Sequence, residues 1–299
     1  MGLKPIAVVL AMTRQKLLLN KIRHHLQKAG VTTYIQHMGS KKFLTAQLVL
    51  GLAVREAYRL SYRRAAQFLK EHYSLRMHWT TLQKAASRLP AWFWEHLLRA
   101  SAPEYSALVA VDGSGFARTN PSEHYLHRIS GARPQVTVKL SILVDVDARK
   151  ILSARVRTRP AHDIKDVHGL ITRAPCLPQT LLADKGYDAQ HLHEWLDNKG
   201  IRLIAPVRRG CQHGWHRKKL RDNFPKEEYH QRSIVESLFG AIKKLYGSHV
   251  RGKSARTVRA ELMMRLIHYN ISCWLIRDFL HRRYKPNIFK VFFLKEVHE

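Results

Sequence analysis

Acidic residues are scarce in this sequence of 299 residues. Only 22 Asp and Glu stand against 52 Lys and Arg, which leaves a formal net charge of +30. A surface this basic repels itself unless a polyanion neutralises part of it. Nucleic acid is therefore the expected partner. A ribosomal or architectural protein would be comparably basic, but such chains are usually shorter and poorer in buried apolar strands. A basic membrane-surface protein fits less well still.

Cysteine is also rare. Three cysteines at irregular positions, Cys176, Cys211 and Cys273, exclude a disulfide framework and favour a reducing compartment. Cys211 lies close to His213 and His216 in the segment CQHGWH. Four regularly spaced ligands are missing there, so we expect a loop and no zinc site.

Long hydrophobic runs are missing as well. The longest early run, residues 6–12, is too short to cross a bilayer, and no small-residue cleavage pattern follows it. We therefore expect no signal segment and no membrane anchor, and a cytoplasmic protein associated with the nucleoid. Repeats and low-complexity segments are absent too. The 45% of hydrophobic residues suffice for the cores of one catalytic-sized domain and a smaller one.

Residues 1–104 carry amphipathic helical patterns and no convincing strand alternation, which predicts an all-helical N-terminal region. Within it, residues 61–89 predict two helices around a break at 72–79, with Thr80 or Thr81 as the cap of the second. A helix-turn-helix there would offer basic side chains to DNA phosphates or base edges, namely Arg63, Arg64, Lys84 and Arg88. Plain packing of two short helices is the alternative reading.

From residue 105 the pattern changes to short apolar strands. Five strands are expected, in ALVAVDGSGF, where the strand ends at Asp112, and at 135–144, 151–157, 179–183 and 201–205. The second and third form a hairpin around the turn DVDARK. Helices are expected at 163–173, capped by Asp163, at 189–198 and at about 260–280. This order predicts an α/β fold with a mixed five-stranded sheet.

Three carboxylates follow from this layout. Asp112 and Asp184 each end a predicted strand, and Glu236 lies on a later helix, so a mixed sheet can bring all three to one edge. Hard oxygen ligands favour Mg²⁺ or Mn²⁺. Two such ions about 4 Å apart can activate a nucleophile and stabilise the leaving oxygen in phosphodiester cleavage. Either aspartate alone would serve equally well as a turn former.

The segment around Glu236 carries a polar stripe. Tyr229, Arg232, Glu236 and Lys243 lie three, four and seven residues apart, which places them on one side of a helix with apolar residues opposite. One carboxylate is thus flanked by two cations and a phenol. An isolated helix with this pattern would more often be read as having an ordinary solvated face.

Basic segments flank the predicted helices of the C-terminal part. Residues 207–228 are too charged to form a core, and we expect a loop that faces DNA phosphates, with Arg208 and Arg209 among its contacts. Residues 281–299 form a basic tail.

The three carboxylate blocks resemble those of the DDE transposases of the IS4/IS5 insertion-sequence superfamily. The blocks are VDGSGF, ADKGYD and a tyrosine followed at fixed intervals by arginine, glutamate and lysine. The resemblance covers roughly residues 105–247. It implies an RNase H-like catalytic domain at 105–280, behind the helical region and followed by the C-terminal helix. The stretch between Pro206 and Glu236 is too short for the β-rich insertion that some relatives carry, so hairpin formation at DNA ends is not assumed.

The resemblance also implies roles for the site residues. Asp112, Asp184 and Glu236 would hold two Mg²⁺ ions, with Mn²⁺ as a substitute. Residues near them would contact DNA: Tyr229, Arg232, Lys243 and Lys185. The implied activity is cleavage at the ends of an insertion sequence, followed by joining of the free 3′-hydroxyl to target DNA. Partners would be double-stranded terminal inverted repeats, target DNA and a second copy of the chain.

Two other functions fit the same residues. One is an RNase H-like metal-dependent nuclease that cuts DNA without strand transfer. The other is an inactive, transposase-derived DNA-binding protein, whose binding would not depend on Mg²⁺ or on the carboxylates. Strand transfer of a precut end separates the first from a transposase.

Overall fold

The structure is a computed structural model that describes residues 6–35, 42–118, 137–159, 161–210 and 213–283. The chain begins with helices, as the sequence pattern predicts. These are α1 (Ile6–Lys28), α2 (Thr45–Ala57), α3 (Tyr62–Tyr73), α4 (Trp79–Arg88) and α5 (Ala91–Ala100). In α3 the Ser61 side chain accepts a hydrogen bond from the Arg64 backbone N–H, and Ser74 closes the helix in the left-handed conformation. The second helix of the predicted pair starts slightly earlier than expected, because His78 caps α4 instead of Thr80 or Thr81.

A mixed sheet follows the helices. Its strands are β1 (Leu108–Arg118), β2 (Thr137–Asp145), β3 (Lys150–Arg157), β4 (Thr180–Leu182), β5 (Arg202–Ile204) and β6 (His249–Val250). The order is β3-β2-β1-β4-β5, with β6 paired to the end of β1. The first three strands are antiparallel, whereas β4 and β5 run parallel to β1. The mixed α/β class is confirmed, but the predicted number of five strands is wrong. The sixth strand has only two residues, too few to show any periodicity.

The predicted end of the first strand at Asp112 is also wrong. Strand β1 continues through the glycine-containing segment to Arg118, and Asp112 pairs with Ile142 in its middle. The reason is pairing with the long strand β2 on one side, which keeps Gly113 and Gly115 extended. On the other side of β1, the shorter strand β4 pairs only as far as Ala110, two residues before Asp112.

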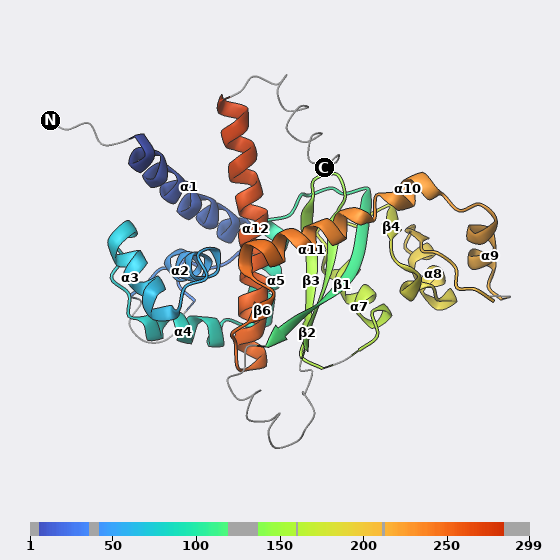
Figure 1. The fold of residues 1–299 in the computed structure, drawn as a ribbon, viewed down its shortest axis with the longest axis horizontal. Coiled ribbons are helices and arrows are strands. Elements are labelled where there is room, and N and C mark those ends of the chain that lie inside the picture. Colours follow the sequence, from blue (N-terminus) through green and yellow to red (C-terminus); the bar gives the residue numbers. More distant parts are fainter. Residues whose placement is uncertain (1–5, 36–41, 119–136, 160, 211–212, 284–299) are drawn as a thin grey trace, which may run out of the picture.

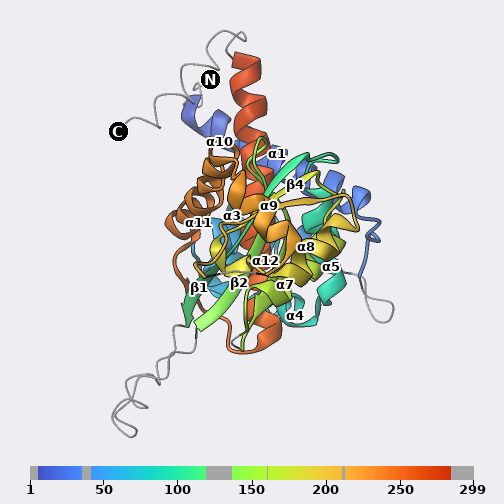
Figure 2. The same cartoon turned by 90° about the vertical axis from the view of Figure 1, so that its right-hand side faces the viewer.

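Helices cover both faces of the sheet (Figure 1). Helices α7 (Ile164–Arg173) and α8 (Gln190–Asp197) pack on one face, where they bury Val109 and Val111 of β1. Figure 2 shows α11 (Ser233–Tyr246) on the opposite side of the sheet from α7 and α8. Alternate strand residues such as Ala110 and Phe116 belong to that second core. Asp163 stands at the start of α7 but makes no capping hydrogen bond with its side chain, contrary to the prediction, because the carboxylate pairs with Lys139.

The long helix α12 (Ala255–Arg283) joins the N-terminal helices to the sheet. It starts five residues before the predicted boundary of 260 and runs three residues beyond 280; the rest of the predicted basic tail lies outside the described residues. Its buried side chains pack on α2, α4 and α5 as well as on β3, so the N-terminal helices and one face of the sheet share a single hydrophobic core. No helix in the described part of the chain is both long and apolar enough to cross a membrane.

The basic segment 207–228 is not simply a loop. It contains α9 (Trp215–Asp222) and the start of α10 (Lys226–His230). Helix α9 buries none of its residues, so no apolar stripe in the sequence marks it. The predicted continuous helix from Tyr229 to Lys243 is also interrupted, because Gln231 and Arg232 form a turn between α10 and α11.

Candidate active site

Asp112 lies within β1, and Asp184 lies two residues after the end of β4, the strand that runs parallel beside β1. The pairing of β1 with β4 ends at Ala110 and Leu182. Asp112 comes two residues after Ala110, and Asp184 comes two residues after Leu182. Each carboxylate accepts a backbone hydrogen bond through its Oδ1, from Gly113 at 2.7 Å and from Gly186 at 2.6 Å. These bonds fix both side chains at the point where the two strands separate.

Arg232 links the first aspartate to the glutamate. Its Nη2 donates a hydrogen bond to Oε1 of Glu236, one turn further along the chain, and its Nη1 lies 3.7 Å from Oδ2 of Asp112. The guanidinium also lies over the ring of Tyr229, with 5.9 Å between Cζ and the ring centroid. The short turn before α11 therefore places a cation between carboxylates from a strand and a helix.

The first aspartate is affected electrostatically by the other two carboxylates. Burial raises the pKa of Asp112, and the negative charges of Asp184 and Glu236 raise it further. The hydrogen bond from Gly113 and the charge of Arg232 oppose this rise without cancelling it. Burial lowers the pKa of the Arg232 guanidinium, but the hydrogen bond to Glu236 and the nearby charges raise it on balance. The site thus holds more negative charge than one arginine neutralises.

This donor set fits a hard divalent cation. Three carboxylates that repel one another are stabilised by a cation with oxygen preference, as Mg²⁺ and Mn²⁺ have. Among the described residues no three Asp, Glu, His or Cys side chains are already gathered tightly enough to hold a metal ion. The guanidinium of Arg232 lies between Asp112 and Glu236 instead. Metal loading would therefore involve Asp112, Asp184 and Glu236, with Arg232 moving off Glu236.

The other predicted DNA contacts are distributed unevenly. Lys243 lies over the Phe116 ring of β1, 5.3 Å from its centroid, and Lys185 is exposed beside Asp184. Arg208 is used internally, because its guanidinium donates to the carbonyls of Lys185 and Gly186 at 3.2 and 3.0 Å. Arg209 is exposed on the following turn.

The basic side chains of the N-terminal helices lie outside this cluster. Arg63 lies over the Trp79 ring, 5.1 Å from its centroid, and Arg64 is exposed on the same helix. Lys84 and Arg88 line a cavity of about 510 Å³ between α4, the start of α2 and the side chains of Tyr34, Ile35, Lys42 and Phe43. The fold therefore does not bring these four side chains to the carboxylates.

Two supporting clusters were not expected from the sequence. Asp188, fully buried, accepts hydrogen bonds from Arg217 at 2.7 and 2.6 Å and from the Arg208 backbone N–H at 2.8 Å, which attaches α9 to the segment after Asp184. In the second cluster, Asp163 pairs with Lys139 and lies against Gly113, where an added Cβ would come within 2.8 Å of its Oδ1. The sequence signals for both were acidic residues in loops, which are indistinguishable from turn formers. Cys211 of the CQHGWH segment lies outside the described residues, whereas Cys176 and Cys273 are free thiols.

Comparison with known proteins identifies the family. The model of the transposase DDE domain matches residues 106–271, more than half of the chain and all three carboxylates. No curated protein matches the chain. Among solved structures, a piggyBac transposase synaptic complex with hairpin DNA is similar over 95% of this chain and 83% of that chain, with 10% sequence identity and a TM-score of 0.41. On the match to the family model, the chain belongs to the transposase DDE domain family.

Proposed function

We propose that this chain is the transposase of an insertion sequence of the IS4/IS5 superfamily, with an RNase H-like catalytic core. The observation that carries the proposal is the arrangement of three carboxylates: Asp184 follows β4 beside Asp112 of β1, and the Arg232 guanidinium links Asp112 to Glu236 of α11. Membership of the transposase DDE domain family supports it. The high positive charge supports double-stranded DNA as the substrate, both at the terminal inverted repeats and at the target.

The reaction we infer is hydrolysis at the element end, followed by attack of the freed 3′-hydroxyl on a target phosphodiester. In the first step an O–P bond forms to water and the bond to the 3′-oxygen breaks; in the second the 3′-oxygen replaces a target oxygen on phosphorus. Two divalent cations would supply activation of the attacking oxygen and stabilisation of the leaving one. Asp112, Asp184 and Glu236 are the residues that would hold them.

The neighbouring side chains would orient the DNA. Arg232, once released from Glu236, would bind a backbone phosphate through its planar guanidinium, and Lys243 would act as a point charge further along α11. Tyr229 offers a ring on which a displaced nucleotide can stack. Two DNA ends have to be joined together, so we expect the DNA complex to contain two copies of the chain.

The decisive experiment compares the wild type with the Glu236→Gln variant. Each protein is incubated with Mg²⁺, a supercoiled target and a labelled duplex that ends in the element's own terminal repeat with a precut 3′-hydroxyl. Glu227→Gln is the matched control, since Glu227 is an exposed glutamate on α10. Joined product from the wild type and the control, but not from Glu236→Gln, would support the proposal.

Other outcomes favour other functions. Nicking of the target without joining would favour a metal-dependent nuclease. DNA binding without either reaction, unchanged by loss of Mg²⁺ and of the carboxylates, would favour an inactive DNA-binding protein. Arg232→Ala should weaken both cleavage and binding, whereas Glu236→Gln should leave binding nearly intact.

A further inference from the structure

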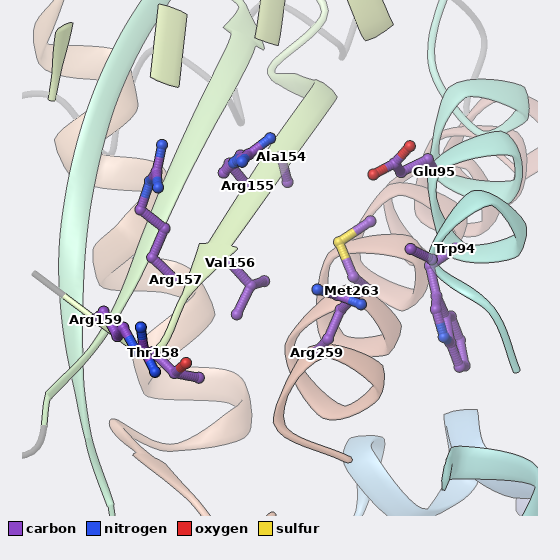
Figure 3. Close-up of a pocket in the computed structure, with 11 residues that line it drawn as sticks. Trp94, Glu95, Ala154, Arg155, Val156, Arg157, Thr158, Arg159, Arg259 and Met263 are labelled. Carbon is purple, nitrogen blue, oxygen red and sulfur yellow. The ribbon is translucent and has the colours of Figure 1, made fainter. Parts of the chain in front are cut away.

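A basic cleft lies at the edge of the sheet, away from the three carboxylates. It has a volume of about 320 Å³ and opens between the edge strand β3, helix α5 and the start of α12 (Figure 3). Four arginines line it, Arg155 and Arg157 of β3, Arg159 just after this strand and Arg259 of α12, together with one carboxylate, that of Glu95. Figure 3 shows Arg259 and Met263 of α12 between β3 on one side and the helix of Trp94 and Glu95 on the other.

The cleft keeps an excess of positive charge. Arg155 and Arg157 share one carboxylate, the buried Asp166, at 3.7 and 2.5 Å. Within the described part of the chain, neither Arg159 nor Arg259 has an ion-pair partner. These two guanidiniums are therefore available to an anion.

The lining carboxylate does not neutralise the two available arginines. Glu95 is directed to another cation, Arg173, with 3.8 Å between Nε and Oε1. Two buried guanidinium nitrogens of Arg173, Nε and Nη2, still have no hydrogen-bond partner among the described residues. Cations therefore outnumber carboxylates in the cleft.

The remaining lining is apolar. Trp94 and Met263 are buried, and Ala154 and Val156 project from the same face of β3. Guanidiniums around an apolar surface match the alternation of phosphate and deoxyribose along a nucleic acid backbone. Phosphate contacts of this kind position a duplex without reading its sequence.

The sheet register relates the cleft to the candidate active site. Asp112 pairs with Ile142 of β2, and Ile142 pairs with Ala154 in the wall of the cleft. Two strand spacings separate Asp112 from Ala154, which is roughly 10 Å. Phosphates of one DNA strand follow one another at about 3.4 Å along the helix axis, so this separation corresponds to about three nucleotides.

We propose that this cleft is a second DNA-binding site, which holds the sugar–phosphate backbone of a duplex a few nucleotides from the carboxylates. Arg159 and Arg259 are its principal phosphate contacts, and Arg155 and Arg157 form its rim. The inference rests on the DNA-binding part of the proposed function and not on cleavage or joining. A chain that binds DNA without cutting it would still use this cleft.

The test measures binding alone, in the absence of Mg²⁺. Fluorescence anisotropy with a labelled duplex gives the slope of log K against log salt concentration for the wild type and for the double variant Arg159→Ala/Arg259→Ala. Each lost phosphate contact reduces that slope by about 0.9, so the double variant should lose about two units of slope. The double variant Arg159→Lys/Arg259→Lys keeps the charges and should retain most of the slope.

A matched control separates site binding from net charge. Arg23→Ala/Lys199→Ala removes two exposed cations from α1 and from the end of α8, and its slope should equal that of the wild type. Thermal unfolding of every variant confirms that it is folded. A further variant, Thr158→Glu, adds a negative charge to the cleft while keeping all four arginines. The proposal is overturned if the alanine variant keeps the wild-type slope, if the control loses as much, or if the wild type does not bind DNA.

Discussion

Replacement of Arg265 by methionine tests how the N-terminal helices are fixed to the catalytic part of the chain. Arg265, on α12, is 1% exposed. Its guanidinium donates to Glu56 of α2 at 3.0 Å and to Glu261 at 2.5 Å. It also donates to the carbonyls of Gly247, where α11 ends, at 3.2 Å, and of His249 in β6 at 3.0 Å. One side chain thus joins α2, α11, β6 and α12.

The expected loss follows from what methionine leaves behind. It has a similar shape but no charge, so two buried carboxylates lose a cation and two carbonyls lose their donor. Breaking a buried ion pair from one side costs about 3–5 kcal/mol. Glu56 still pairs with Arg55, and Nη2 of Arg251 remains 3.6 Å from its Oε1. The unfolding free energy should therefore fall by an amount at the lower end of this range, about 3 kcal/mol. The melting temperature should fall by about 6–12 °C.

Differential scanning calorimetry and urea denaturation measure this loss directly. Arg256→Met, an exposed arginine on the same helix, is the control and should change the free energy of unfolding by less than about 0.5 kcal/mol. Burial already raises the pKa of Glu56, and loss of Arg265 raises it further. The deficit should therefore shrink as the pH is lowered and Glu56 becomes protonated in the folded variant. A deficit below about 1 kcal/mol, or one independent of pH, would refute this reasoning.

Three further predictions concern the site and its supports. Burial lowers the pKa of His193 to about 4, below its value in the unfolded chain, so stability present above pH 6.5 is lost toward pH 4. In His193→Gln the unfolding free energy should depend less steeply on pH between these values, by about 1.4 kcal/mol per pH unit, because one proton fewer is taken up on unfolding. Denaturation at several pH values measures this slope. Asp188→Asn should release Arg217, and trypsin should then cleave α9 faster than in the wild type; equal rates would contradict the role of Asp188. Mg²⁺ should stabilise the folded wild type by about 2.7 kcal/mol when its concentration is 100 times Kd, and so raise the melting temperature. The melting temperature of Asp112→Asn should not rise, and equal shifts in the two proteins would exclude Asp112 as a ligand.

Much of the fold was predictable because it depends on local patterns. The alternation along 137–145 and 150–157, with a polar turn between them, specifies a hairpin wherever one face is buried. The helical patterns of residues 45–100 likewise depend on neighbours three and four residues away. The hairpin was expected, with boundaries that differ by one or two residues, and so was the all-helical character of the N-terminal region.

Elements without a local pattern were not predictable. Strand β6 exists because residues 249–250 meet the end of β1, and two residues contain no period. Helix α9 is exposed and highly charged, so it resembles a loop in sequence, and Asp188 attaches it through Arg217. Asp112 appeared to end a strand because the following glycines resemble a turn, whereas pairing with β2 keeps the backbone extended.

The sequence by itself determined the chemistry available to this protein: an excess of cations, an α/β pattern and three carboxylates in spaced motifs. Tertiary structure alone decided how these groups meet. It placed Arg232 between Asp112 and Glu236. It also directed the guanidinium of Arg208 to backbone carbonyls and brought Arg159 and Arg259 into the same cleft. The physical reason is that charge and periodicity are properties of residues and their near neighbours, whereas contacts between residues a hundred positions apart depend on how strands and helices pack.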